Sequence, residues 1–191
     1  MSHSAAPAYN EWVFCASCSA RLPDSESARG RPRRFCSPKC RTRAWRERDG
    51  LPWELAKLDR WCRRVGKRPY TIDGRPASSA DPGTWSSYAA ASRSKFGHGV
   101  GVMLGDGLGC WDIDHCLQGG RLAPWARQAL SLVGDPVFVE RSLSGDGLHV
   151  FVRADPAPGW RQGGVEFSSS GHFIAVTGHA VSLDELARGA A

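Results

Sequence analysis

The second half of the chain is a series of short apolar runs, each four to seven residues long, separated by turns rich in Gly, Asp and Ser. Runs of this length between turn residues predict β-strands, and short connections predict antiparallel hairpins. We expect three hairpins, formed by Val100–Leu104 with Leu108–Asp114, by Val137–Arg141 with Leu148–Val152, and by Gly164–Phe167 with Phe173–Thr177.

Helical spacing of apolar residues occurs between these strands and before them. It predicts helices over Trp53–Val65, over Asp81–Lys95 with Asp81 or Thr84 as N-cap, over Leu122–Val133, and a short helical tail over Leu183–Arg188. Hairpins interleaved with helices predict an α+β fold with a mostly antiparallel sheet and helices on one face.

Two carboxylates one residue apart end the second of the expected strands. Side chains of a strand alternate between its two faces, so Asp112 and Asp114 are expected to project from the same face. Carboxylates held side by side repel each other, and a divalent cation commonly relieves that repulsion. Two solvated acids at a strand edge are the alternative for this pattern alone.

Two further residues of the expected sheet can join this pair. His149 alternates with Leu148 and Val150, and Glu166 alternates with Val165 and Phe167, so each avoids the face of its apolar neighbours. A single His or Glu on a strand is usually a packed or solvated residue. Together with the Asp pair, however, these residues indicate one polar cluster on a sheet face.

Four of the seven cysteines form two close pairs near the N-terminus. Cys15 and Cys18 are followed, after seventeen residues, by Cys36 and Cys40, a spacing suited to tetrahedral Zn²⁺ bound by four thiolates. The polar segment between the pairs has no apolar periodicity, so the metal would supply its folding free energy. Four thiolates leave no open position, which indicates a structural rather than a catalytic zinc. The odd number of cysteines argues against a disulfide framework.

Charge is distributed unevenly along the chain. Residues 1–68 hold 16 Lys and Arg against 7 Asp and Glu, whereas residues 69–191 hold 9 against 12. A basic N-terminal part predicts contact with a polyanion, and the basic stretch after the second Cys pair offers phosphate contacts from Arg41, Arg43, Arg46 and Arg48. A solvated basic helix is the alternative.

The expected organisation is a four-cysteine zinc-finger module with a basic helix over residues 1–48, a helical linker over 49–66 and a body over 67–191. The sequence has no apolar run of membrane-spanning length and no signal-peptide core, so we expect a cytoplasmic protein without a membrane partner. A monomer is the default expectation.

The order of three motifs resembles the archaeo-eukaryotic primase superfamily, and more narrowly its bifunctional primase-polymerase catalytic domain. The motifs are Asp-Ile-Asp at 112–114, Ser-x-Ser-Gly-x-Gly-x-His at 142–149 and Val-Glu-Phe at 165–167. The segments at 67–86 and 171–178 are also similar, and the resemblance covers about residues 67–180. The zinc-finger module resembles short treble-clef-like fingers over Phe35–Ala44.

The resemblance implies a DNA primase or polymerase that makes short primers on single-stranded DNA from NTPs or dNTPs. It implies that Asp112, Asp114 and Glu166 bind catalytic Mg²⁺ or Mn²⁺ and that His149 contacts the phosphates of the incoming nucleotide. Amides of the loop containing Ser144, Gly145 and Gly147 are further candidates for holding the triphosphate, and so are the side chains of Arg141 and Lys67.

Two departures from the resemblance affect these expectations. His115 follows the Asp pair directly, and it is a third ligand, a nucleotide contact or, as strand alternation favours, a residue on the opposite face. Members of this branch often continue into a helical primer-binding region and a helicase, and neither is found in this sequence. We therefore expect the chain to work with a separate helicase, or as the catalytic fragment of a split enzyme, in a phage or mobile-element system. The other candidate functions are a catalytically silent nucleic-acid-binding zinc protein and a metal-dependent phosphoesterase.

Overall fold

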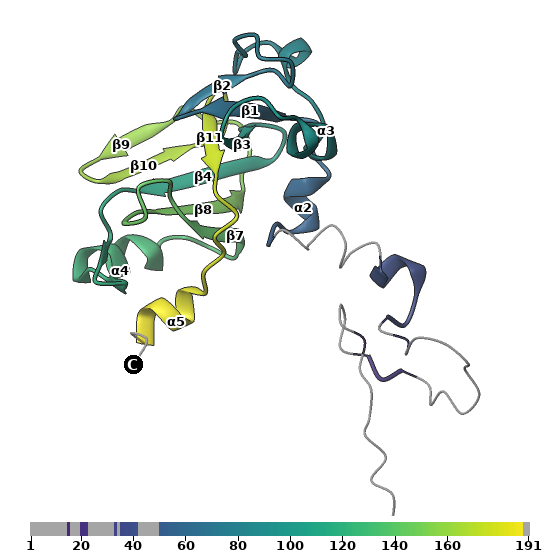
Figure 1. The fold of residues 1–191 in the computed structure, drawn as a ribbon. Coiled ribbons are helices and arrows are strands. Elements are labelled where there is room, and N and C mark those ends of the chain that lie inside the picture. Colours follow the sequence, from purple (N-terminus) through teal and green to yellow (C-terminus); the bar gives the residue numbers. More distant parts are fainter. Residues whose placement is uncertain (1–14, 16–19, 23–32, 34, 42–49, 189–191) are drawn as a thin grey trace, which may run out of the picture. The chain divides into compact units, whose positions relative to one another are not determined.

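The computed structural model describes residue 15, residues 20–22, residue 33, residues 35–41 and residues 50–188 (Figure 1). The internal contacts divide the chain into two units, Met1–Arg48 and Asp49–Ala191. None of the helices in the described part is long and apolar enough to span a bilayer.

Two antiparallel sheets form the second unit. The four-stranded sheet has the order β11-β3-β1-β2, with β1 at Trp61–Val65, β2 at Arg68–Tyr70, β3 at Gly99–Met103 and β11 at Phe173–Val176. The five-stranded sheet has the order β7-β8-β4-β10-β9, with β4 at Leu108–Ile113, β7 at Pro136–Arg141, β8 at Leu148–Arg153, β9 at Trp160–Gln162 and β10 at Val165–Ser168. A small ribbon pairs β5 (Leu117–Gln118) with β6 (Arg121–Leu122).

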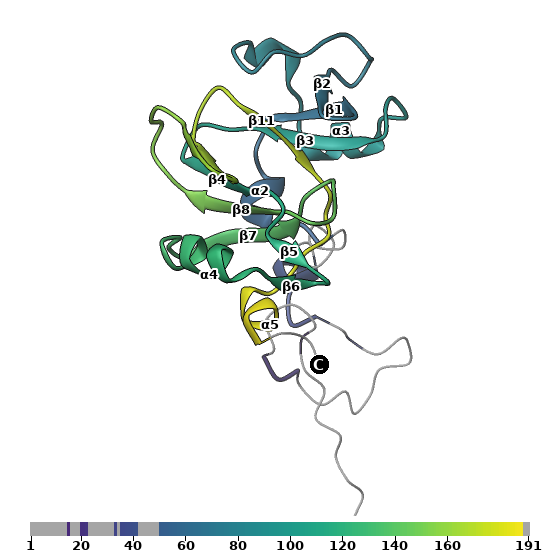
Figure 2. The same ribbon diagram turned by 90° about the vertical axis from the view of Figure 1, so that its left-hand side faces the viewer.

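The helices are short and pack around these sheets. They are α2 at Trp53–Ala56, a 3-10 turn at Pro82–Thr84, α3 at Tyr88–Arg93, α4 at Pro124–Ser131 and α5 at Leu183–Arg188. Two views show α4 and α5 on the side of the five-stranded sheet that faces away from the four-stranded sheet (Figures 1 and 2). The expected α+β fold with mostly antiparallel strands is therefore confirmed.

Two apolar cores lie on the two faces of the five-stranded sheet. Between the sheets, Trp61, Val102 and Ile174 pack with Cys110 and Phe151. On the opposite face, a second core contains residues of β4, β8, α4 and α5, namely Ile113, Leu148, Val150, Ala126 and Leu186. Both faces of this sheet are thus covered, and polar side chains on its inner face must lie where the inter-sheet core ends.

The segment 53–65 is not one helix, contrary to the sequence prediction. It is helical only over Trp53–Ala56, and Trp61–Val65 forms β1, which pairs with β3 on one side and β2 on the other. Gly66 has a φ of 59°, a value that favours glycine, and it allows the tight turn into β2. Strand pairing therefore overrides the helical spacing of the apolar residues.

Two of the three expected hairpins are also wrong. β3 and β4 are joined by the expected turn, in which Gly105 and Leu108 exchange backbone hydrogen bonds of 3.1 Å, but the strands then enter different sheets. β10 and β11 likewise belong to different sheets. The hairpin of β7 and β8 is confirmed. The expected helix over Asp81–Lys95 is interrupted because Ser86 forms a bridge with Trp61, and Ser87 caps α3.

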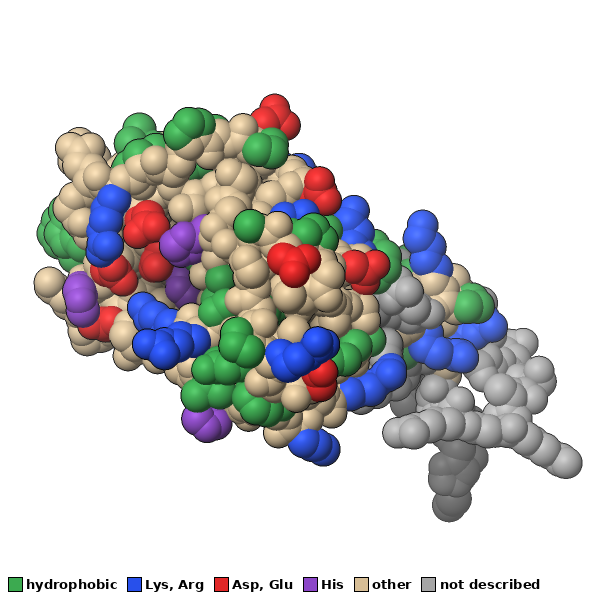
Figure 3. Space-filling model, turned by 90° about the horizontal axis from the view of Figure 1, so that it is seen from above, with side chains coloured by type: hydrophobic (Ala, Val, Ile, Leu, Met, Phe, Trp, Pro, Cys, Tyr) green, Lys and Arg blue, Asp and Glu red, His purple; other side chains and the backbone are tan. Residues whose placement is uncertain are grey.

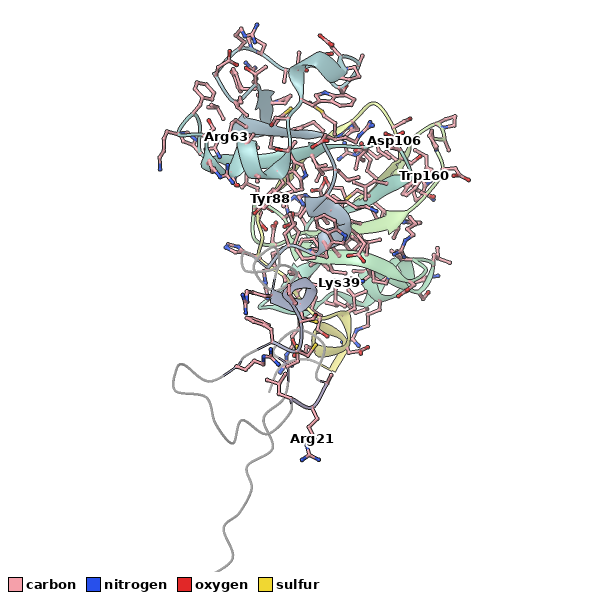
Figure 4. The ribbon with its side chains drawn as sticks, turned by 90° about the vertical axis from the view of Figure 1, so that its right-hand side faces the viewer. Arg21, Lys39, Arg63, Tyr88, Asp106 and Trp160 are labelled. Carbon is pink, nitrogen blue, oxygen red and sulfur yellow. The ribbon has the colours of Figure 1, made fainter. Side chains whose placement is uncertain are left out.

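The conversion of Trp61 to Ala tests the placement of β1 in the core. Trp61 is fully buried, its indole N–H donates to the Leu55 carbonyl over 3.1 Å, and its ring meets Tyr88 edge-on (Tyr88 is labelled in Figure 4). We expect a loss of about 3–5 kcal/mol in the free energy of unfolding, measured by denaturant titration. Trp125→Ala, at a side chain that is 42% exposed, should cost less than about 1 kcal/mol. Equal losses would contradict the placement.

Candidate active site

A single row of charged and polar side chains crosses all five strands of the larger sheet. Asp112 on the central strand β4 lies directly opposite His149 on β8 and Glu166 on β10. The row continues outward because His149 lies opposite Glu140 on β7, and Glu166 lies opposite Arg161 on β9. Residues directly opposite in antiparallel strands share one face, so these five side chains project together.

The row occupies the inner face of the sheet, beyond the end of the apolar core. Cys110 and Phe151, which are opposite each other in the preceding row on this face, belong to the inter-sheet core. Asp112 and His149 are one step further along the same strands. The space-filling view shows acidic side chains gathered beside histidine, with Lys and Arg nearby, on one face of the molecule (Figure 3).

A cavity of about 260 Å³ opens over this row. It is lined by Asp112, Asp114, His149, Glu166 and Arg161 from the five-stranded sheet. The opposite wall comes from the smaller sheet through Lys67 in the β1–β2 turn and through residues 172–175 at β11. The structure therefore brings together Asp112, Asp114, His149, Glu166 and Lys67, all of which the sequence analysis singled out.

Asp112 is the most buried carboxylate of the cavity and has the least compensation. Burial is the main cause that raises the pKa of its carboxyl, and the charges of Asp114 and Glu166 raise it further, against the effects of His149 and Lys67. Its Oδ1 atom is buried without a hydrogen-bond partner among the described residues. Nε2 of His149 lies 3.8 Å from this oxygen, beyond hydrogen-bond distance.

Arg161 was missed by the sequence analysis and lies beside the other two acids. Its guanidinium is 3.4 Å from Asp114 and 3.6 Å from Glu166, and its side chain is 64% exposed. Strand β9 is an edge strand of three residues, which the sequence did not mark as a strand. Because surface ion pairs of this kind are weak, Arg161 can leave the carboxylates when a ligand enters.

Glu140 was also missed, although it lies in a predicted strand. It is fully buried, and its carboxylate accepts a 3.0 Å hydrogen bond from Nδ1 of His149. The apolar neighbours Val139 and Val137 suggested an ordinary alternating strand, and only the pairing register places Glu140 opposite His149. The sequence signal that could have identified Glu140 was an acidic residue on the buried face of a predicted strand.

The loop between β7 and β8 reaches the cavity through Leu143. Ser144 hydrogen-bonds Ser142 and Asp146, and the loop is closed by a 2.9 Å bond from the Ser142 amide to the Gly147 carbonyl. Arg141 points to the face of β7 opposite to Glu140, and its guanidinium lies 3.4 Å from the Gly145 carbonyl. The described residues that line the cavity do not include Arg141, Ser144, Gly145 or Gly147.

His115 lies outside the cavity. Strand β4 ends at Ile113, and His115, with a φ of 52°, lies beyond that end, where strand alternation no longer applies. Its ring is 80% exposed and lies 2.6 Å from the carboxylate of Asp146. This partner raises the pKa of His115, and the hydrogen bonds from Ser144 and His115 lower the pKa of Asp146. The structure thus places His115 beside Asp146, and His115 is not among the described residues that line the cavity.

Three cysteines of the first unit come together. The sulfur atoms of Cys15, Cys36 and Cys40 all lie within 4.8 Å of one another, and Cys36 and Cys40 are 3.5 Å apart. Tetrahedral zinc with bonds of about 2.3 Å separates its sulfur ligands by about 3.8 Å. No disulfide joins the cysteines that the structure describes. These three residues could hold a metal ion, and Cys18 lies outside the described residues.

The predicted basic helix falls mostly on residues that are not described. Ser37 caps a helical turn at 38–41 by accepting a 3.1 Å hydrogen bond from the amide of Cys40, and Arg41 is exposed there. Arg43, Arg46 and Arg48 lie outside the described residues.

The chain is similar to a known phage protein. No family model matches the chain. The chain is 33% identical over 144 residues to a protein of Nitratiruptor phage NrS-1 named DNA Primase-polymerase, and the match covers 65% of this chain. It covers 20% of the phage protein, so the chain spans about a fifth of the length of this curated relative. This similarity supports the resemblance to primase-polymerases.

Proposed function

We propose that the chain carries the nucleotidyl-transfer site of a DNA primase-polymerase and makes short primers on single-stranded DNA. The observation that carries the proposal is the row of Asp112, Glu166 and His149 beside Asp114 in one cavity. The similarity to the phage DNA Primase-polymerase supports the same function.

The donor set fits a catalytic Mg²⁺ or Mn²⁺. Asp112, Asp114 and Glu166 supply carboxylate oxygens, which these hard cations prefer. The buried Oδ1 of Asp112, without a hydrogen-bond partner in the described part of the chain, is the kind of atom that a cation satisfies. When bound, the cation supplies charge neutralisation for the 3′-hydroxyl, the α-phosphate and the departing pyrophosphate.

The remaining residues of the cavity would bind and orient the nucleotide. His149 lies on the floor of the cavity with Nε2 toward Asp112, where it can donate to a phosphate oxygen. Lys67 and Arg161 are exposed cations at the rim. Lys67 can neutralise the triphosphate, and Arg161, once displaced from Asp114 and Glu166, can do the same. Of the loop between β7 and β8, the cavity lining includes Leu143, and the amides of Ser144, Gly145 and Gly147 remain proposed contacts of the triphosphate.

The first unit would bind the template through a module that a metal ion folds. We propose that Cys15, Cys18, Cys36 and Cys40 bind one structural Zn²⁺ and that Arg41, Arg43, Arg46 and Arg48 contact phosphates of the template strand. The proposed partners are single-stranded DNA, NTPs or dNTPs and a separate helicase, and the proposed state is a monomer in the cytoplasm of a bacterial host.

The test is a primer-synthesis assay with the full chain, single-stranded DNA, labelled NTPs or dNTPs, and Mn²⁺ or Mg²⁺. Short products that require template, nucleotide and metal would support the proposal. Release of phosphate or cleavage of the DNA without nucleoside triphosphates would favour a phosphoesterase. Binding of DNA without products or nucleotide binding would favour a catalytically silent nucleic-acid-binding protein.

His115→Ala separates the nucleotidyltransferase from the phosphoesterase. A phosphoesterase that uses His115 with the Asp pair requires this residue, whereas the structure places its ring outside the cavity and against Asp146. We expect the rate of primer synthesis to stay within about threefold of the wild-type rate, since substitutions away from the reacting groups cost little. A loss of about a hundredfold, the scale of a missing general acid or base, would contradict this placement.

A further inference from the structure

The carboxylate of Glu140 is a buried anion with a complete set of hydrogen-bond donors. It accepts from the amides of Thr177 and Gly178 at 3.0 and 2.8 Å, and the hydroxyl of Thr177 lies 3.0 Å away. A further donor is Nδ1 of His149 at 3.0 Å, whereas the hydroxyl of Thr177 has a second, closer acceptor in the Arg141 carbonyl at 2.8 Å. A fully buried charge persists in a protein when it is compensated in this way.

The backbone that supplies these donors is shaped for the anion. Thr177 and Gly178 follow β11, and Gly178 has a φ of 74°, which favours glycine. Successive amides that point to one side form a concave anion site. The next residues pair with β7 through the backbone. The amide of Arg141 donates to the His179 carbonyl over 3.0 Å, and the amide of Val181 donates to the Val139 carbonyl over 3.0 Å. Glu140 is therefore held at a fixed position between the two sheets.

The position of Glu140 determines how His149 presents its ring. Nδ1 must carry a proton to donate to the carboxylate, and the opposite nitrogen, Nε2, then points toward Asp112 in the cavity. His149 is only 5% exposed, so few other orientations are open to the ring. When Nε2 also carries a proton and donates a hydrogen bond to an acceptor, the ring is positively charged, and the Glu140 carboxylate balances that charge.

We propose that Glu140 is the positioning residue of the nucleotide site, which holds His149 with Nδ1 on its carboxylate and Nε2 toward the phosphates of the triphosphate. This inference rests on the proposed function, because it takes a nucleoside triphosphate as the ligand of His149. Glu140 itself does not contact the cavity. It acts through His149, in the way that a carboxylate behind a metal-bound histidine orients that ligand.

The isosteric variant Glu140→Gln tests the role without removing volume. The amide oxygen can accept from Thr177 and Gly178, but the amide N–H₂ then faces His149 and donates to Nδ1. Long-range ¹⁵N–¹H spectra of imidazole, assigned with His149→Gln, should show a protonated Nδ1 in the wild type and an unprotonated Nδ1 in Glu140→Gln. This readout needs no activity and no bound nucleotide.

Calorimetric titration with Mg²⁺-dATP and Mg²⁺-ATP, without template, measures the second consequence. We expect Glu140→Gln to bind the triphosphate about fivefold to tenfold more weakly, since a charge-assisted hydrogen bond is replaced by a neutral one. In a His149→Gln background the same change should alter the affinity by less than about twofold, because the residue through which it acts is gone.

Thr177→Val is the matched control. It removes the Thr177 hydroxyl, which lies 3.0 Å from the Glu140 carboxylate and 2.8 Å from the Arg141 carbonyl, but leaves the bond between Glu140 and His149. We expect a lower stability with a triphosphate affinity within about twofold of the wild type. If Glu140 served only to tether residues 177–178, Glu140→Gln, which keeps an acceptor for their amides, would bind the triphosphate no more weakly than Thr177→Val, and the inference would be overturned.

The outcomes separate the inference from the proposed function. A wild-type protein that binds triphosphate, combined with an unchanged affinity in Glu140→Gln or an unprotonated Nδ1 in the wild type, would overturn the inference alone. A wild-type protein that binds no triphosphate would overturn the role of His149 in the proposed function, and the inference with it.

Discussion

Replacement of Asp112 by Asn should abolish primer synthesis while the protein remains folded. The change keeps the shape of the side chain but removes a charge from the proposed metal site, where Asp112 is central between His149 and Glu166. Charge stabilisation by such a site is worth several kilocalories per mole. We therefore expect a loss of about a thousandfold or more in the rate of nucleotide incorporation, measured on single-stranded template with Mn²⁺ or Mg²⁺.

The same substitution should stabilise the metal-free protein. Burial raises the pKa of Asp112, so its ionised form is less favourable in the folded than in the unfolded chain. This cost is absent below the ordinary carboxyl pKa of 3.8 and fully present above the raised value. We expect the midpoint of thermal unfolding of Asp112→Asn to exceed that of the wild type by about 2–4 °C at neutral pH, and the difference to vanish toward acid pH.

Two controls make this prediction specific. Asp106→Asn changes an acid that is 82% exposed, pairs with Arg60 and lies outside the lining of the cavity, so activity should persist. Saturating Mg²⁺ should reduce the stability difference, because the cation binds the folded wild type and compensates its carboxylates. Full activity of Asp112→Asn, or a large loss of its stability, would contradict the proposed mechanism.

Substitution of Cys36 by Ser should remove the metal from the first unit. Cys36 lies within 4.8 Å of the sulfurs of Cys15 and Cys40, and structural zinc in small modules contributes about 10–16 kcal/mol of binding free energy. We expect one zinc per wild-type chain by elemental analysis and less than about a tenth of this in the variant. The affinity for single-stranded DNA should fall together with the zinc content, since the basic residues that follow Cys40 are no longer held by a folded module.

Cys62→Ser is the matched control for this experiment. Cys62 is a buried cysteine of β1 whose sulfur is 3.6 Å from the Thr84 carbonyl, and burial raises its thiol pKa to about 11. Metals bind the thiolate form of cysteine, and the raised pKa keeps the thiol of Cys62 protonated. Its substitution should therefore leave the zinc content unchanged. Equal zinc in the wild type and Cys36→Ser would exclude the Cys cluster as the binding site.

Local sequence patterns predicted those elements whose partners are near in the chain. The hairpin of β7 and β8, the helix at Pro124–Ser131 and the tail at Leu183–Arg188 all follow from alternation or helical spacing within a short segment. The same patterns failed at Trp61–Val65, which is a strand because two other strands pair with it. They also failed at β3 and β4, where a correctly predicted turn joins strands of different sheets.

The site shows the same division. Alternation was sufficient to place Asp112, His149 and Glu166 on a common face, because each lies on a strand with apolar neighbours. Asp114 lies one residue beyond the end of β4, and it joins them in the lining of the cavity. Glu140 and Arg161 were missed because no spacing in the sequence indicates which residues of neighbouring strands lie opposite each other. Of the opposite wall, which comes from the other sheet, the sequence analysis named only Lys67.

The sequence by itself determined which residue types this protein offers, in which order, and on which face of each strand, because side-chain direction follows from local backbone geometry. The tertiary structure alone decided the register that aligns Glu140, His149, Asp112, Glu166 and Arg161, and the division of neighbouring strands between two sheets. Register depends on burying the apolar face of every strand at once, so it is a property of the whole fold and not of any segment.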